Sequence, residues 1–107
     1  YSTLEDLFKW THGLNTGRLL TKESLALMYS KGETIYGREV PYGFGFRIDT
    51  KREKSIYHHG KWNGFSTGLT KYLEDDLVVI VLEHTSYNAT KSLTKKIKKI
   101  VTENFVL

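Results

Sequence analysis

The chain contains one segment, Leu77–Leu82, that is apolar at every position. Its six residues suit a strand, and an uninterrupted apolar run is typical of a strand that is covered on both faces and has neighbours on both sides. Polar turn residues precede it at Glu74–Asp76, and it is the last strand that we predict. The sequence therefore predicts a sheet whose outermost strand has a neighbour either in a segment not present here or in another copy of the chain.

The other strands are predicted from alternation and turn signals. Apolar residues alternate with Gly and Arg from Tyr42 to Ile48, which predicts a strand with one aromatic face. The polar stretch 49–54 suits a turn, and 55–59 can return antiparallel. A second turn at 62–64 and a strand at 65–73 follow. These segments predict an antiparallel meander of about four strands.

Helical patterns flank the predicted sheet. A capping box at Ser2–Glu5 predicts a helix at about 3–12, and Thr21 begins a shorter helix that ends before Gly32. A last amphipathic helix begins at about Ala89, with its apolar stripe formed by Leu93, Ile97, Ile100 and Val101. We therefore predict a single α+β domain at 1–107, with the C-terminal helix on one face of the sheet and the N-terminal helices at one end.

Composition excludes some classes of protein and leaves others open. A chain of 107 residues with 39% apolar and 26% charged residues is typical of one small globular domain. No apolar run approaches the ~20 residues of a membrane span. The absence of cysteine excludes disulfides, thiolate metal sites and a cysteine nucleophile. The net charge of +4 favours anionic partners without identifying one. The chain begins at Tyr1 without an initiator Met, so we expect it to be a piece of a longer polypeptide.

The most informative stretch is His58–Phe65, which reads His-x-Gly-x-x-x-Gly-Phe. This pattern is similar to the third active-site box of the class C beta-lactamases and of related DD-peptidases and esterases, in which Lys or His opens the box. The stretches Tyr1–Trp10, Tyr42–Phe46 and Tyr72–Asp76 resemble other parts of that family and occur in the same order. The resemblance implies a C-terminal fragment of a penicillin-recognising serine hydrolase, corresponding to part of its sheet lobe.

The resemblance also implies roles for individual residues. Charge develops on the carbonyl oxygen during acyl transfer and has to meet preorganised donors. Carried onto this sequence, one such donor is the backbone N–H of Lys61. Gly60 leaves room for substrate beside the strand, and His58 takes the place of the box Lys near the nucleophile. His59 and Trp62 are expected to contact substrate, although ordinary packing explains Trp62 equally well.

The nucleophile that the resemblance requires is absent from this chain. The family carries it in Ser-x-x-Lys, with a Tyr-x-Asn box nearby. Ser92–Lys95 matches Ser-x-x-Lys, but it follows the third box, which is the wrong order, and no Tyr-x-Asn occurs. The implied substrates are D-alanyl peptides, beta-lactams or esters, cleaved without a cofactor. A neutral imidazole at His58 favours esterase or peptidase chemistry, and the family is usually found in the periplasm or at the cell surface.

Simpler readings and a second class of function remain open. A histidine metal site is disfavoured because His58 and His59 point to opposite faces of a strand. Lys91–Lys99 contains five lysines, which is most often the solvated face of a packed helix. The alternative function is a self-standing basic module that binds an anionic polymer or protein partner. We expect no nucleic-acid partner. A cleft shared by His58 and Trp62 favours the hydrolase, whereas a continuous lysine and aromatic face favours the binding module. We also expect self-association through the free edge of Leu77–Leu82.

Overall fold

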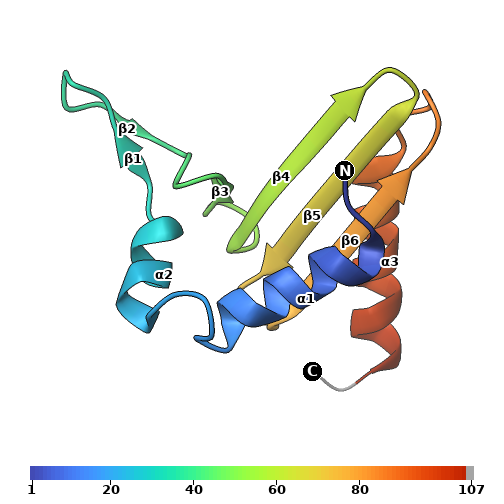
Figure 1. The fold of residues 1–107 in the computed structure, drawn as a ribbon, viewed down its shortest axis with the longest axis horizontal. Coiled ribbons are helices and arrows are strands. Elements are labelled where there is room, and N and C mark those ends of the chain that lie inside the picture. The colour runs from blue at the N-terminus through green and yellow to red at the C-terminus, as the bar shows by residue number, and fades with distance from the viewer. Residues whose placement is uncertain (106–107) are drawn as a thin grey trace.

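The computed structural model describes residues 1–105 and confirms the α+β class, with an antiparallel four-stranded sheet and a C-terminal helix (Figure 1). The elements, in chain order, are α1 (Leu4–Asn15), α2 (Lys22–Met28), β1 (Gly32–Glu33), β2 (Glu39–Val40), β3 (Arg47–Asp49), β4 (Ser55–Trp62), β5 (Phe65–Tyr72), β6 (Leu77–Glu83) and α3 (Thr90–Asn104). No helix within residues 1–105 is long and apolar enough to cross a membrane.

The main sheet is the predicted meander, with strand order β3-β4-β5-β6 and antiparallel pairing throughout. Gly64, with φ +74°, allows the tight turn between β4 and β5, and Asp76 at φ 48° closes the turn before β6. The small ribbon of β1 and β2 extends away from this sheet, as Figure 1 shows. Its strands have two residues each and were not predicted, because so short a pair leaves no periodic pattern.

Side chains alternate between the two faces of the sheet. We call one face the α1 face, because Lys71 of β5 bonds from it to Asn15 of α1. Ile56, His58, Gly60 and Trp62 of β4 belong to this face by alternation. We call the other the α3 face, because α3 packs on it against β5 and β6. It carries the remaining residues of β4, namely Ser55, Tyr57, His59 and Lys61.

The hydrophobic core lies on the α1 face. Phe46, Ile56 and Leu69 form it, and the side chain of Ile56 is 1% exposed. Partly buried residues that pack around them are Met28, Tyr29, Ile48 and Ile80. The ring of Trp10 stacks on Phe46 with 6.0 Å between ring centroids, which ties α1 to the core. This core ties β3, α1 and α2 to the α1 face of the sheet.

The α3 face is packed mostly with small and hydroxyl residues, beside the buried side chains of Tyr72 and Val79. Ser66 and Thr90 share a hydrogen bond of 2.7 Å, and Gly68 lies beneath Thr90. Thr90 and Thr94 are the buried residues of α3, whereas its expected apolar stripe is largely exposed: the exposed fractions of Leu93, Ile97 and Ile100 are 38%, 37% and 58%. The predicted orientation of α3 was therefore wrong, because small residues on β5 let the threonine side of the helix approach most closely.

The predicted strand from Tyr42 to Ile48 was wrong over most of its length. Only the last part is β3, while Tyr42 forms an isolated bridge to Arg47 and the residues between them make a loop. A Cβ on Gly43 would lie 2.2 Å from the carbonyl oxygen of Met28, and Gly45 has φ +87°. The glycines that suggested a period of two instead let a loop pack closely against α2.

Two further boundaries differ from the prediction. α1 continues to Asn15, because Gly13 lies inside the helix and packs against Leu19. β4 continues to Trp62 instead of ending at His59. On β6, only Val79 is fully buried, and the free edge has no strand beside it among the described residues. The strand is nevertheless covered on both faces, by α1 and by α3, and Leu82 is its one exposed residue, so the expected cover is confirmed while a second neighbouring strand is absent from the described residues.

Candidate functional site

The second half of β4 has a free edge. β3 pairs only with Ser55–Tyr57, so the outer edge of β4 from His58 to Trp62 has no partner strand within residues 1–105. The inner edge pairs with β5 along its whole length. A short β3 therefore exposes the backbone of the His-x-Gly segment to an incoming extended chain.

Hydrogen-bond alternation determines which backbone groups lie on that edge. Leu73 donates from its N–H to the carbonyl oxygen of Lys54 at 2.9 Å, so even-numbered residues along β4 bond toward β5. On β3, the N–H of Ile48 donates to Pro41, away from β4, which agrees with the same alternation. The N–H groups of odd-numbered residues therefore point outward, and among them are His59 and Lys61.

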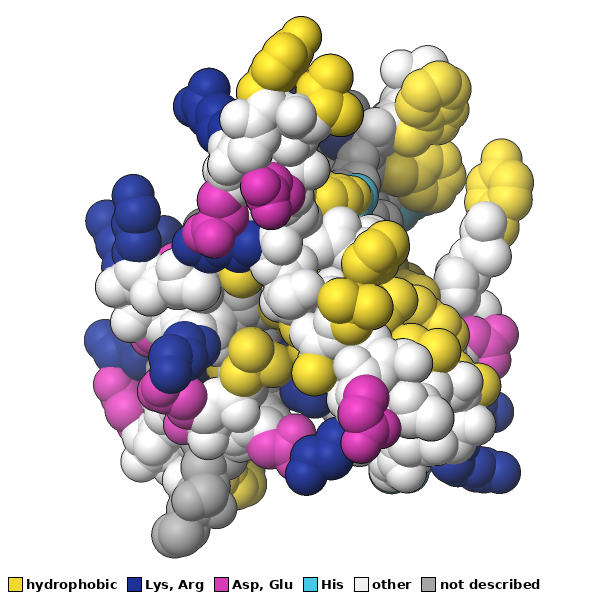
Figure 2. Space-filling view, turned by 90° about the vertical axis from the view of Figure 1, so that its left-hand side faces the viewer, with side chains coloured by type: hydrophobic (Ala, Val, Ile, Leu, Met, Phe, Trp, Pro, Cys, Tyr) yellow, Lys and Arg dark blue, Asp and Glu magenta, His cyan; other side chains and the backbone are white. Residues whose placement is uncertain are grey.

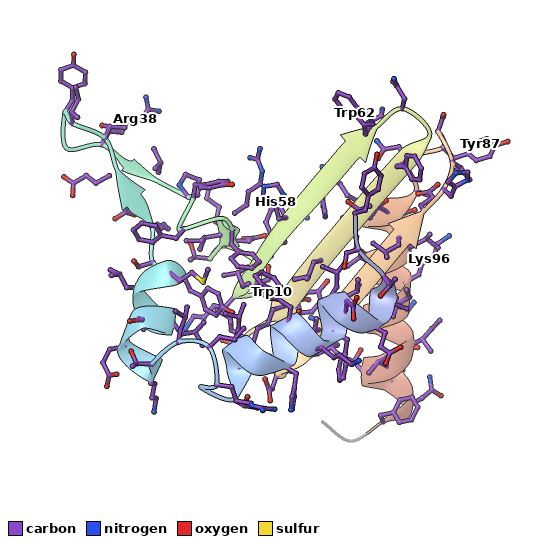
Figure 3. The ribbon with its side chains drawn as sticks, in the orientation of Figure 1. Trp10, Arg38, His58, Trp62, Tyr87 and Lys96 are labelled. Carbon is purple, nitrogen blue, oxygen red and sulfur yellow. The ribbon has the colours of Figure 1, made fainter. Side chains whose placement is uncertain are left out.

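His58 lies near this edge on the α1 face, and Figure 3 shows its side chain beside β4. Its Nε2 atom is 3.2 Å from the hydroxyl of Tyr42, and the two rings meet edge to face with 6.2 Å between centroids. The guanidinium of Arg47 lies 6.0 Å from the centroid of the Tyr42 ring. His58 remains exposed, so its ring is oriented by Tyr42 and is open to a ligand.

Gly60 pairs with Thr67 of β5, whose side chain lies on the same face. A Cβ there would lie 2.7 Å from the Oγ1 atom of Thr67, which itself donates to the carbonyl oxygen of Gly60 at 3.5 Å. The glycine adds no side chain of its own between His58 and Trp62, so the Thr67 hydroxyl lies directly beside its backbone. A ligand that lies along the edge can therefore approach the backbone here.

His59 is separated from this group because its ring lies on the α3 face. The ring is 5.3 Å from that of Tyr57 and is half-buried. Burial lowers the pKa of His59 below its usual value, and the positive charges of Lys91, His58 and Arg47 lower this pKa further. The structure thus brings His58, Gly60 and the Lys61 N–H together at one edge, and places the His59 imidazole on the other side of the sheet.

Trp62 lies at the far end of β4 (Figure 3) and is 79% exposed. It lines an open pocket of about 430 Å³ between the β4–β5 turn and the loop after β6, together with Lys61, Asn63, Ser66 and Asn88. His58 is not among the residues that line this pocket. The structure therefore does not place His58 and Trp62 in one cleft, which was the arrangement expected to favour the hydrolase.

Sequence reasoning missed Tyr42 as a neighbour of His58. The Tyr-Gly-Phe-Gly-Phe pattern assigned its ring to the aromatic face of a strand, and this assignment hid its position beside the His-x-Gly segment. The only available signal was the run of glycines, which also permits a loop.

No group of three or more side chains suited to a metal ion occurs in the described part of the chain.

Comparison with known proteins adds one similarity. The chain is 28% identical over 85 residues to penicillin-binding protein 4* of Bacillus subtilis (strain 168). The match covers 78% of this chain and 19% of that protein, so the chain spans about a fifth of the relative's length. No family model and no solved structure matches the chain. The comparison thus shows a chain that is similar to a region of a penicillin-binding protein.

Proposed function

We propose that this chain is the C-terminal part of a penicillin-binding-protein-like serine hydrolase and supplies its third active-site box. The observation that carries the proposal is the free edge of β4, where the outward N–H of Lys61 follows Gly60. The similarity to penicillin-binding protein 4* supports the same family. The serine nucleophile belongs to a part of the parent protein outside these 107 residues.

The proposed chemistry is acyl transfer through a serine acyl-enzyme. The serine oxygen attacks the substrate carbonyl, and negative charge develops on the carbonyl oxygen. The N–H of Lys61 donates to that oxygen, as the second donor beside the nucleophile's own N–H. Because the strand is rigid and already paired to β5, this donor needs little reorganisation when the charge appears.

Substrate binding follows from the same edge. An extended acyl compound, such as a D-alanyl peptide of peptidoglycan, pairs with the outward groups of β4 as an added strand, and beta-lactams or esters present the same carbonyl. The side chain of His58 contacts polar groups of the substrate, and Tyr42 orients the His58 ring. His59 contributes through its outward backbone N–H, since its ring is on the α3 face. Trp62 contacts substrate that extends beyond the end of the strand.

The proposal is tested by labelling with a fluorescent penicillin. We expect the full-length parent to be labelled at a serine outside this region, and the 107-residue chain alone to remain unlabelled, because it holds one oxyanion donor and no nucleophile. Intact-mass measurement and peptide mapping locate the adduct. Labelling of the isolated chain, at Ser92 for example, or a parent that never forms an adduct, contradicts the proposal.

A further inference from the structure

The α3 face of the sheet is covered over only part of its width. α3 packs against β5 and β6, and the face of β4 beside it carries no helix in the described chain. An open cleft of about 660 Å³ lies there, between α3 and the β3–β4 region. We call it the basic cleft, because five cationic side chains line it, namely Arg52, Lys91, Lys95, Lys98 and Lys99. Figure 2 shows Lys and Arg side chains, with Asp and Glu among them, along the left and lower parts of the molecule, and hydrophobic ones toward its top, centre and right.

The carboxylates of the basic cleft are already engaged. Glu53 pairs with Lys98, whose ammonium also lies 3.7 Å from Asp75. The Oδ1 atom of Asp49 accepts the backbone N–H of Lys51 at 2.9 Å. Of the other four cations, Lys99 lies 3.9 Å from Glu103 on the same helix, whereas Arg52, Lys91 and Lys95 make no ion pair with a described carboxylate. The cleft therefore has a positive charge that its own carboxylates do not neutralise.

The lysines of the cleft form a row along α3. Lys91, Lys95 and Lys99 are four residues apart and lie on one side of the helix, so successive ammonium groups are separated by about 6 Å along its axis. Like charges at this spacing repel one another and destabilise a helix. A ligand with a matching row of negative charges removes the repulsion, whereas a single compact anion reaches only part of the row.

His59 forms part of the wall of the cleft opposite Lys91. Its ring is held against Tyr57, and Gly68 makes room for it, since a Cβ there would lie 3.0 Å from the Cδ2 atom of His59. With its pKa lowered by burial and by Lys91, the neutral imidazole offers an N–H donor to a bound anion. Thr94 and Thr102 also line the cleft.

We infer that the basic cleft is a binding site for a linear oligophosphate, either free or as part of a larger molecule, which lies along Lys91, Lys95 and Lys99 and is held by Arg52. The site is separate from the proposed acyl-transfer edge, because none of His58, Gly60 and Lys61 lines it. It does not depend on the hydrolase proposal, and its test uses the 107-residue chain alone.

The test titrates the chain with inorganic phosphate, tripolyphosphate and a long polyphosphate at constant ionic strength, followed by the NMR signals of the four histidine rings. We expect tripolyphosphate to bind about tenfold more tightly than phosphate, because more charges are matched. If a long polyphosphate binds with the same affinity per site as tripolyphosphate, the cleft binds a segment no longer than tripolyphosphate. Bound anion should raise the pKa of His59 and should shift the NMR signals of its ring more than those of His58 or His84.

A matched pair of double variants separates the site from net charge. Lys91→Gln with Lys95→Gln should weaken tripolyphosphate binding about tenfold, and Lys22→Gln with Lys96→Gln, which removes the same charge outside the cleft, should change it less than about twofold. Lys96 lies on the same helix (Figure 3) and does not line the cleft. Equal weakening by both variants, equal affinity for phosphate and tripolyphosphate, or a saturated complex without a response of His59 overturns the inference.

Discussion

The two faces of the sheet are held by different kinds of packing. The α1 face buries large apolar side chains such as Ile56 and Leu69. The α3 face buries mostly threonines, serines and a glycine beside Tyr72 and Val79, and the hydroxyl groups of Ser66 and Thr90 are paired at 2.7 Å. Apolar burial stabilises roughly in proportion to area and tolerates some change of shape, whereas close contact of small residues tolerates very little. One sheet thus combines a core that depends on volume with an interface that depends on fit.

Function divides along the same line in our proposals. His58 and Gly60 share the α1 face beside the free edge of β4, and His59 faces the lysines of α3. Two adjacent histidines therefore report on two different environments. Substitutions on one face of the sheet at a time test whether the two faces differ in stability and in function.

The largest effect is expected in the apolar core. Ile56→Ala removes a side chain that is 1% exposed, and should lower the free energy of unfolding by about 3 kcal/mol, because it combines lost burial with a cavity. Thr94→Ala on the α3 face should cost about 1 kcal/mol or less, since it removes one hydrogen bond and gains helix propensity. Urea unfolding monitored by circular dichroism measures both. Equal costs would remove the distinction between the faces.

A second test compares two glycines of neighbouring strands. Gly68→Ala should destabilise by about 2 kcal/mol, because its Cβ would lie 2.5 Å from Cγ2 of the buried Thr90. Gly60→Ala should cost less than about 1 kcal/mol, because its Cβ meets the terminal hydroxyl of Thr67, which rotates away. A larger loss for Gly60→Ala in the same unfolding measurement would show that the α1 face is the less tolerant one at close contacts.

Sequence patterns predicted the meander and the positions of its turns well. Glu74–Asp76 and Asn63–Gly64 are turns for local chemical reasons, and local chemistry is visible in sequence. The helix start at Thr21 was also predicted, and its side chain accepts the N–H of Ser24 at 3.1 Å. Features that depend on a distant partner were not predicted, as with the loop of Gly43, which fits a carbonyl of α2.

The candidate site was predicted only in part, for the same reason. The His-x-Gly segment identified β4, and alternation predicted opposite faces for His58 and His59. The free edge follows from the three-residue length of β3, and the contact with Tyr42 follows from the loop before it. Neither the free edge nor the contact with Tyr42 can be predicted from the residues of the His-x-Gly segment. The orientation of α3 was missed because its threonines fit against Gly68, a contact between residues far apart in sequence.

The free edge of β6 leads to a third prediction, of moderate size. We propose that the isolated chain self-associates there, because the strand is apolar and its outer backbone groups lack a partner strand in the described chain. Leu82→Lys, at a side chain that is 39% exposed, should shift the protein toward monomer with little loss of stability. Sedimentation at micromolar concentration is the measurement. A wild-type chain that is monomeric throughout contradicts the proposal.

The smallest effect concerns pH. The folded pKa of His59 lies below its value of 6.5 in the unfolded chain, so the unfolded state binds the proton more readily. The stabilisation is therefore complete above pH 6.5 and is lost as the pH falls through the folded pKa. His59→Gln should reduce this slope of unfolding free energy against pH, measured by urea unfolding at a series of pH values. An unchanged slope in this variant would show that the folded state does not lower the pKa of His59.

The most direct test of the central claim compares these two histidines in the full-length parent. The measurement is the rate of acylation by a fluorescent penicillin for His58→Ala and for His59→Ala. The account predicts a loss of about 100-fold for His58→Ala and less than about threefold for His59→Ala, because only the ring of His58 lies on the face that carries Gly60. Equal losses in the two folded variants, or a larger loss for His59→Ala, would contradict the assignment of the acyl-transfer site to the α1 face of β4.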